Sequence, residues 1–351
     1  MIKGVSLFAN VGIAETYIKN HDIEIVVANE LLENRALFHS EMHPDCRMIQ
    51  GDITDDETFT KIVDAAKQEQ CDFLIATPPC QGMSLAGKMH ENDPRNSLIK
   101  YVIKLAKELQ PQNILIENVP KVLNTYLVHK RKKLKIRAFI EKELAPLGYK
   151  INPVIVDAAD YETPQKRRRA IFLISKGEEW KLPEKKPKIT VREAIAHLPS
   201  LESLEDSSIP FHRAKKHNPR HIEFLKHTPT GKTALHNSVH YPKKADGTRI
   251  KGYATTYKRI DWDKPSPTIT MANGSISSQN NVHPGRLQED GTYSDARVLT
   301  LKEIFILTGL PDDWSPPEWA SEQLIRQVIG EGVPPKLIDN LLTTMPRGEE
   351  S

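Results

Sequence analysis

The chain of 351 residues has a formal net charge of +3, with 38% hydrophobic and 27% charged residues. This composition is typical of a globular protein of about two domains, and attraction to nucleic acid must come from local clusters of charge. The three cysteines, Cys46, Cys71 and Cys80, are too few and too scattered for a disulfide framework, which favours a reducing cytoplasm. Because the sequence shows no cleavage signal and no long apolar run, we expect a cytoplasmic protein without membrane contact.

The first hundred residues predict alternating strands and helices. Residues 4–9 favour a strand, which a tight turn at residues 10–12 connects to a helix from about Ile13. The next strand, residues 24–30, ends in Glu30, and an acid at this place commonly binds a ribose diol, although a solvated strand end is the simpler interpretation. After a third strand at residues 48–50, Asp52 can cap the stretch that starts near Asp55, which leads into a helix over residues 56–68, or bind an adenine amino group, and the two roles are compatible. This order is the opening of a nucleotide-binding βαβ fold.

A cysteine follows the fourth predicted strand, residues 71–76. Pro78 and Pro79 end this strand and stiffen the backbone just before Cys80, and the glycine-containing loop beyond is expected to move. Such a thiol suits a covalent nucleophile under a lid, although a lone cysteine is more often an inert core residue. A fifth strand, residues 113–116, ends in Glu117, which places a carboxyl at the same sheet edge as the thiol.

The middle of the chain adds basic residues. Residues 121–146 are predicted to be helical and include the basic run of residues 129–135, either a solvated helix face or a contact to the DNA backbone. Strands follow at residues 151–156 and 170–174. Arg167 and Arg169 precede the second of these strands on one face, and their planar guanidinium groups suit a phosphate or a carbonyl oxygen.

The last part of the chain begins with a proline- and charge-rich linker after about Ser175. Between His212 and Arg259 there are twelve Lys or Arg, two acids and six histidines, which predicts a surface that follows phosphates. His217 and His221 have helical spacing, but no cysteine lies nearby and we expect no metal. Thr300 with Glu303 predicts a capping box for a helix through residue 307, and an apolar stripe predicts a last helix after residue 335.

Six short motifs occur in a fixed order along the chain. They are Leu7-Phe8-Ala9 with Gly12, Gly51-Asp52-Ile53, Pro79-Cys80-Gln81 with Ser84, Glu117-Asn118-Val119, Gln165 with Arg167 and Arg169, and the segment from Arg297 to Trp314. In this order they resemble the bacterial DNA cytosine-5 methyltransferases of restriction-modification systems, over nearly the whole chain. Ser6, Asn10 and Ile13 depart from the first motif of that family, and Glu331 stands where the family usually has Asn. Asn10 tolerates left-handed backbone and is expected to keep the turn.

The resemblance implies a fold, a reaction and partners. The fold is a doubly wound, mostly parallel α/β sheet of the S-adenosylmethionine-dependent methyltransferase type, in a catalytic domain of residues 1–178 and 322–351. A smaller target-recognition domain, residues 179–321, reads double-stranded DNA. The reaction transfers a methyl group from S-adenosyl-L-methionine to carbon 5 of a flipped cytosine in a specific site. The resemblance further implies a monomer near the bacterial nucleoid, and a cognate restriction endonuclease encoded nearby is possible.

The family's functional residues carry over to matching positions. The implied catalytic residues are Cys80, Glu117, Arg167 and Arg169, with Cys80 as thiolate, Glu117 on ring nitrogen 3, Arg167 on the base carbonyl and Arg169 in support. The implied cofactor-binding residues are Phe8, Ala9, Asn10, Gly12, Glu30, Leu31, Asp52, Ile53 and Pro79. The implied substrate-binding residues are Gln81, Ser84, Arg95, Asn118 and Gln165, and no metal ligand is implied.

Three alternatives remain at this stage. The same chemistry on transfer RNA is the first, but the Cys-Phe-Thr element of that branch is absent, since no cysteine follows Cys80. A nicotinamide-dependent oxidoreductase shares the early βαβ pattern, but it leaves Pro79-Cys80-Gln81, Glu117 and the basic segment unexplained. A non-catalytic DNA-binding relative is disfavoured because Cys80 and Glu117 are both present.

Overall fold

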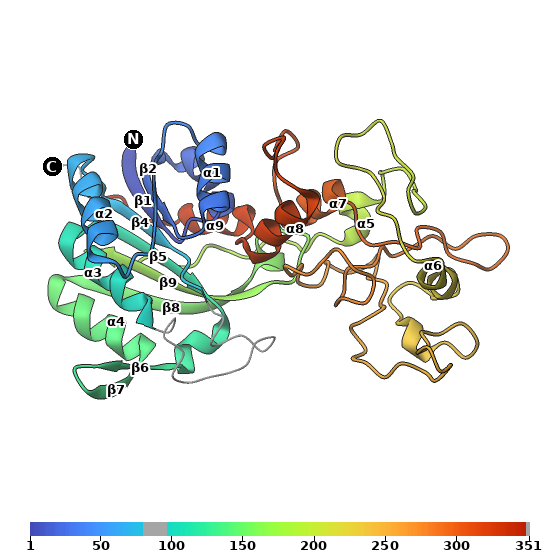
Figure 1. The fold of residues 1–351 in the computed structure, drawn as a ribbon. Coiled ribbons are helices and arrows are strands. Elements are labelled where there is room, and N and C mark those ends of the chain that lie inside the picture. Colours follow the sequence, from blue (N-terminus) through green and yellow to red (C-terminus); the bar gives the residue numbers. More distant parts are fainter. Residues whose placement is uncertain (80–96, 349–351) are drawn as a thin grey trace. The chain divides into compact units, whose positions relative to one another are not determined.

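A computed structural model describes residues 1–79 and 97–348 of the chain. The chain divides into two compact units, which we describe separately. The first comprises Met1–Asp157, Arg168–Lys185 and Leu337–Ser351, and the second comprises Ala158–Arg167 and Lys186–Lys336 (Figure 1). The functional domains expected from the sequence, residues 1–178 with 322–351 and residues 179–321, stay a prediction, because compactness does not show which part reads DNA.

A seven-stranded sheet forms the centre of the first unit. Its strand order is β3-β2-β1-β4-β5-β9-β8. Neighbouring strands from β3 to β5 are parallel, and β9 is antiparallel to both β5 and β8. This order confirms the predicted doubly wound, mostly parallel α/β fold. The strands are Ile2–Leu7 (β1), Ile23–Glu30 (β2), Arg47–Gln50 (β3), Phe73–Ala76 (β4), Asn113–Asn118 (β5), Tyr149–Asp157 (β8) and Arg168–Lys176 (β9).

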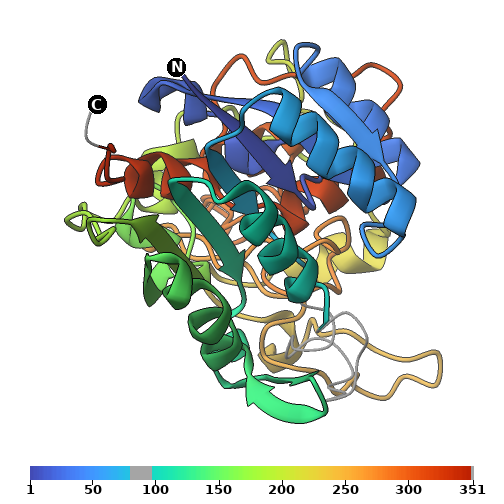
Figure 2. The same cartoon turned by 90° about the vertical axis from the view of Figure 1, so that its left-hand side faces the viewer.

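Helices cover both faces of this sheet (Figures 1 and 2). On one face lie α2 (Asp56–Gln68), α3 (Ile99–Leu109) and α4 (Ile136–Leu144), whose apolar side chains share one core with β1, β4 and β5. On the other face lie α1 (Glu33–Met42) and α9 (Pro335–Leu342). Because both faces are covered, the central strands are nearly continuous apolar runs and all side chains of β4 are buried.

The structure corrects the prediction of a helix over residues 121–146. Tyr126–His129 (β6) pairs antiparallel with Lys132–Lys135 (β7), after a 3-10 turn at Pro120–Asn124 and before α4. Lys130 and Arg131 at the hairpin turn have φ values of 46° and 63°, which a right-handed helix does not allow. The basic run therefore belongs to a hairpin and not to a helix face.

Two further predictions near the N-terminus are wrong in detail. The segment after the first turn forms only short 3-10 turns, Ile13–Glu15 and Ile18–His21, where a helix from Ile13 was predicted. Asp55, and not Asp52, caps α2 by accepting a hydrogen bond from the Thr58 N–H. Asp52 instead accepts from the N–H of Thr54, 2.8 Å away, within its own loop.

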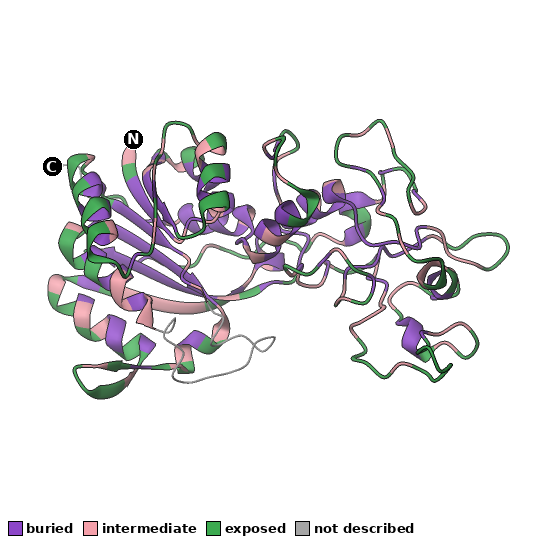
Figure 3. Ribbon diagram, in the orientation of Figure 1, coloured by how far each residue is buried: buried purple, intermediate pink, exposed green. Residues whose placement is uncertain are grey.

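The second unit consists mainly of loops joined by isolated β-bridges around short helices. The predicted capping box at Thr300 and Glu303 is confirmed at the start of α7. Figure 3 shows that buried residues run along α7 and α8. No helix in the described ranges is long and apolar enough to cross a membrane. The α-helices of this unit are Val191–Ile195 (α5), Pro219–Lys226 (α6), Leu301–Thr308 (α7) and Glu322–Glu331 (α8).

Buried charges hold the loops of the second unit together. The guanidinium of Arg297 is fully buried and lies 2.8 Å from an Asp295 oxygen and 2.9 Å from both Glu303 oxygens. Burial opposes the charge of Arg297, but the carboxylates of Glu303 and Asp295 outweigh it and raise the pKa of Arg297. The buried Arg259 donates to the backbone carbonyls of three segments, Leu225, His283 and residues 293–295. These arginines connect backbone groups that loops leave without regular partners.

Candidate active site

The candidate site lies at the carboxyl ends of the central parallel strands, all within the first unit. β1 leads into Phe8, β2 ends at Glu30, β4 leads into residues 77–79, and β5 carries Glu117 near its end. Because β1 lies between β2 and β4, and β4 lies beside β5, these four strand ends are neighbours at one edge. Open α/β sheets bind their ligands at this edge.

The turn after β1 has an unusual backbone. Phe8, Asn10 and Gly12 all have positive φ, at 58°, 52° and 80°. Asn10 thus adopts the left-handed conformation that was predicted for it. The Glu30 carboxylate fixes the turn, because its Oε2 accepts the N–H of Asn10 at 3.0 Å while its Oε1 accepts the N–H of Leu32 at 3.0 Å. Glu30 is 6% exposed, so it is a structural part of the turn and not a solvated strand end.

A cluster of buried polar side chains packs against this turn. The Ser6 hydroxyl donates to Glu15, whose other oxygen lies 3.5 Å from Nε2 of the buried His39. Burial by itself raises the pKa of Glu15, but the contacts with His39, His43 and Ser6 outweigh it and lower this pKa. The ring of His43 lies beside that of His39, with centroids 4.6 Å apart and planes inclined by 43°, and its Nε2 faces the α-carbon of Gly12. The departure Ser6 thus makes a buried hydrogen bond beside the turn, and the departure Ile13 is buried in the core.

The residues that were predicted to bind the cofactor differ in how far they are exposed to solvent. Leu31, directly after Glu30, is 54% exposed, and Phe8 is half-buried, so both present apolar surface at the strand ends. Asp52 is exposed in the loop after β3, whereas Ile53 is buried beneath it. Apolar surface beside two carboxylates suits a ligand with an aromatic base and a sugar.

Two side-chain hydrogen bonds fix the backbone that leads to Cys80. Nδ2 of Asn118 donates to the carbonyl of Pro78 at 2.9 Å, and the Thr77 hydroxyl donates to the carbonyl of Phe8 at 2.9 Å. The second bond joins the turn after β1 to the end of β4, which leads to the cysteine. This role of Thr77 was not predicted from the sequence. Pro79 is half-buried. The predicted residues Cys80, Gln81, Ser84 and Arg95 lie outside the described residues.

Glu117 forms an ion pair with Arg169 at this edge. Nε of Arg169 lies 2.6 Å from Oε1 of Glu117, and both side chains are largely buried. The pair is possible because β9 runs antiparallel beside β5, with Glu117 opposite Ile171. A carboxylate fixed by a guanidinium can accept hydrogen bonds from a polar ring without rotating away.

Gln165 and Arg167 make their contacts within the second unit. The guanidinium of Arg167 is 3% exposed and donates to the carbonyls of Ile269, Gly330 and Glu331 at 2.9–3.1 Å. The amide of Gln165 bonds the N–H of Ile269 and the carbonyl of Leu307. Both side chains therefore fix backbone of the second unit, whereas Arg169 forms the ion pair with Glu117.

The model of the C-5 cytosine-specific DNA methylase family matches residues 2–347. The chain belongs to this family. This methylase is 50% identical over 346 residues to the Type II methyltransferase M1.HgaI of Avibacterium volantium, with 97% of each chain covered. It is 31% identical over 304 residues to the Type II methyltransferase M1.HphI of Haemophilus parahaemolyticus, covering 84% of this chain and 73% of that one. It is thus an enzyme that methylates carbon 5 of cytosine in DNA, and the family favours DNA over the transfer RNA alternative.

Solved structures share the fold of the methylase. A variant of DNMT2 from Spodoptera frugiperda superimposes with a TM-score of 0.66 at 17% identity, covering 98% of this chain and 99% of that one. The methyltransferase EhMeth of Entamoeba histolytica gives a TM-score of 0.65 at 15% identity, covering 98% of both chains. At this identity the likeness concerns the fold, and it confirms the predicted methyltransferase architecture.

Proposed function

We propose that the methylase acts through a covalent adduct between Cys80 and a cytosine flipped out of a specific duplex site. The proposal depends chiefly on one observation, the Glu117–Arg169 pair at the strand edge where Asn118 fixes the backbone leading to Cys80. Carbon 5 of cytosine is a weak nucleophile. When the Cys80 thiolate bonds to carbon 6, the ring electrons become available at carbon 5. Carbon 5 then bonds to the methyl group, while the bond between that methyl group and the sulfonium sulfur of the donor breaks and leaves a neutral thioether. Loss of the carbon 5 proton expels the thiolate and leaves 5-methylcytosine.

Glu117 and Arg169 are proposed to stabilise the base during this addition. Addition of the thiolate places negative charge on the ring, and Glu117 relieves it by hydrogen bonding or proton transfer at nitrogen 3. The structure leads us to exchange the roles that were expected for the two arginines. Arg169 pairs with Glu117 and is proposed to contact the base carbonyl, whereas Arg167 holds three backbone carbonyls and is proposed to position its segment.

S-adenosyl-L-methionine is proposed as the cofactor, and it supplies the methyl group when bound. The residues fit it: Glu30 presents a fixed carboxylate for the ribose, and Phe8 and Leu31 present apolar surface for the adenine. The exposed carboxylate of Asp52 can accept a hydrogen bond from an exocyclic amine. Ala9, Asn10 and Gly12 form the turn whose backbone approaches the ligand.

Replacing Gly12 with alanine is expected to weaken binding of S-adenosylmethionine about tenfold or more, a loss that isothermal titration measures. Gly12 has a φ of +80°, and a Cβ there would lie 2.1 Å from Nε2 of His43, whose ring is held against His39. Gly148→Ala is the matched control, because φ is +86° but no atom lies within 4 Å of the added carbon. Backbone strain is about 1–2 kcal/mol in both variants. Equal affinities of the two variants for S-adenosylmethionine would therefore show that the contact between the added Cβ and His43 does not weaken binding.

The biological setting is proposed from the basic segment and the relatives. The twelve lysines and arginines between His212 and Arg259 suit the phosphates of a duplex. Both named relatives are Type II methyltransferases, which supports a restriction-modification role and a cognate endonuclease that recognises the same site. A single chain carries the candidate residues for both cofactor and base, which favours a monomer.

Mass spectrometry of nucleosides tests the proposed function. Duplex genomic DNA and transfer RNA are each incubated with the protein and S-adenosylmethionine carrying a deuterated methyl group. We expect labelled 5-methylcytosine in DNA at a fixed sequence, which sequencing of methylated positions then identifies. Label in transfer RNA alone, or label at cytosines regardless of sequence, would refute the proposal of a site-specific duplex enzyme.

A further inference from the structure

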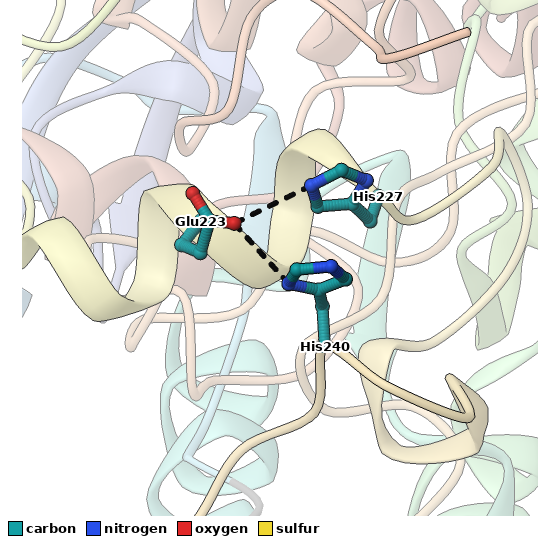
Figure 4. A group of neighbouring side chains, drawn as sticks. All are labelled: Glu223, His227 and His240. Atoms are coloured by element: carbon teal, nitrogen blue, oxygen red, sulfur yellow. Dashed lines mark ion pairs between the residues drawn. The ribbon is translucent and has the colours of Figure 1, made fainter.

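Three side chains of the second unit converge on one point at the end of α6 (Figure 4). Glu223 lies in α6, His227 directly follows this helix, and His240 comes from the loop beyond. Oε1 of Glu223 lies 3.4 Å from Nε2 of His227 and 3.2 Å from Nδ1 of His240. One possible ligand atom from each residue therefore lies within 4.8 Å of the other two.

We propose that Glu223, His227 and His240 bind a zinc ion. Zinc bonds to imidazole nitrogen and carboxylate oxygen are about 2.0–2.2 Å long, so neighbouring atoms of a tetrahedral zinc site are about 3.3–3.5 Å apart. The two separations in this cluster, 3.4 and 3.2 Å, are close to that value. They exceed the roughly 2.7–2.9 Å that is usual for a charge-assisted hydrogen bond. Two histidines and one glutamate leave a fourth position for water.

The stacked histidine rings favour a metal ion over two ion pairs. The ring centroids of His227 and His240 lie 3.8 Å apart, and the planes are inclined by only 18°. Like charges on two rings at this distance would repel each other, which opposes an arrangement of two simultaneous ion pairs with Glu223. Neutral imidazole is the form that binds zinc, and one divalent ion satisfies both nitrogens together with the carboxylate.

A second set of contacts fixes the loop that carries His240. Nδ2 of Asn237 donates to the carbonyl of His240 at 2.9 Å and to the hydroxyl of Thr228 at 2.9 Å. It also donates to the carbonyl of Phe224 at 3.3 Å, in the last turn of α6. Asn237 thus connects the backbone of His240 to the end of α6, which carries Glu223 and is directly followed by His227. Such support is expected of a built site.

The cluster is open to metal ions in solution. The side chains of His227 and His240 are each 37% exposed, and that of Glu223 is 59% exposed. Exposure also allows the small ring rotations that bring all three atoms to bonding distance. A bound ion would connect α6 to the loop beyond it, within the basic segment, so its effect is to stabilise this surface.

The histidines with helical spacing do not form this site. Nε2 of His217 accepts the N–H of Val298 at 3.2 Å, and the ring of His221 packs against Phe224 and Tyr257. Zinc binding therefore requires His227 and His240 and is independent of the pair that the sequence spacing first indicates.

Calorimetric titration of the full-length, untagged protein with zinc chloride tests the proposal, after treatment with EDTA and removal of the chelator. We expect one zinc ion per chain and a zinc-dependent rise in the unfolding temperature. His227→Gln and His240→Gln are each expected to weaken zinc affinity at least tenfold and to remove the rise. X-ray absorption of the zinc-loaded protein should show nitrogen and oxygen ligands with the scattering pattern of two imidazoles.

His236→Gln is the matched control, because His236 is exposed and lies next to Asn237 but outside the cluster. This variant should bind zinc as the natural protein does. Unfolding temperatures without zinc establish that all three variants are folded. Equal zinc affinity in the control and in the two cluster variants would overturn the proposal, as would zinc that shows no imidazole ligands. Neither outcome affects the methylation assay, so the two proposals fail separately.

Discussion

Cys80→Ala is expected to form no measurable 5-methylcytosine in DNA while still binding its DNA site. Without the thiolate, carbon 5 is not activated, and removing a covalent nucleophile lowers kcat by about 10⁴-fold or more. The surroundings that fix the preceding backbone, the Asn118 and Thr77 hydrogen bonds, do not depend on the thiol. The measurement is nucleoside mass spectrometry under single-turnover conditions, with a gel-shift assay for DNA binding.

Cys46→Ala is the matched control for this substitution. Burial raises the pKa of the Cys46 thiol far above its usual range, and burial raises that of Cys71 to about 12, so neither thiol forms a thiolate at neutral pH. We expect Cys46→Ala to retain full activity. Methylation by Cys80→Ala at more than a few per cent of the natural rate would exclude the covalent mechanism.

The parallel sheet could be predicted from the sequence because its central strands are buried on both faces. Such strands are short apolar runs, and β1 to β5 occur within about two residues of their predicted ends. The helix over Asp56–Gln68 was predicted with its observed bounds, since it combines an acidic first turn with an apolar stripe. Cys80 and Glu117 were predicted to lie at one edge of the sheet because parallel strands end on the same side. The structure confirms that β4 and β5, the strands that precede and carry these residues, are neighbours.

The errors occurred where local sequence permits two structures. Residues 121–146 contain enough lysine and leucine for a helix, but the hairpin buries Leu127 between the exposed Tyr126 and Val128, which is an alternation of period two. Propensity favoured the helix, and tertiary packing decided for the hairpin. The 3-10 turns after Gly12 have a similar cause, because the buried contacts of Glu15 with Ser6 and His39 fix the chain in a tighter path.

Contacts between distant residues account for what the sequence could not show at the site. Alternation places Arg167 and Arg169 on one face, but it cannot show that Arg169 meets Glu117 or that Arg167 meets the carbonyls of residues 269, 330 and 331. The cluster of Glu223, His227 and His240 was missed for the same reason, since twelve residues lie between the two histidines in the chain. Only the fold of the loop after α6 brings them together.

Glu117→Gln is expected to lower kcat for DNA methylation about 10²- to 10⁴-fold, the usual contribution of a positioned acid or base. Glutamine keeps the shape of the side chain, but it cannot transfer a proton to nitrogen 3. It also leaves the Arg169 guanidinium, 2.6 Å away, without its charged partner. Because the acid acts after the base has entered the site, we expect KM for DNA to change much less than kcat.

Glu57→Gln is a suitable control for this variant, because Glu57 lies exposed on α2 and its ion pair with Lys61 is a solvated surface contact. It should leave kcat unchanged. Trapping of the Cys80 adduct on DNA containing 5-fluorocytosine separates two roles of Glu117. If the adduct forms at the natural rate in Glu117→Gln, the carboxyl does not assist thiolate addition. If adduct formation slows together with kcat, Glu117 acts on the base at the addition step itself, as its place beside Arg169 at the strand edge implies.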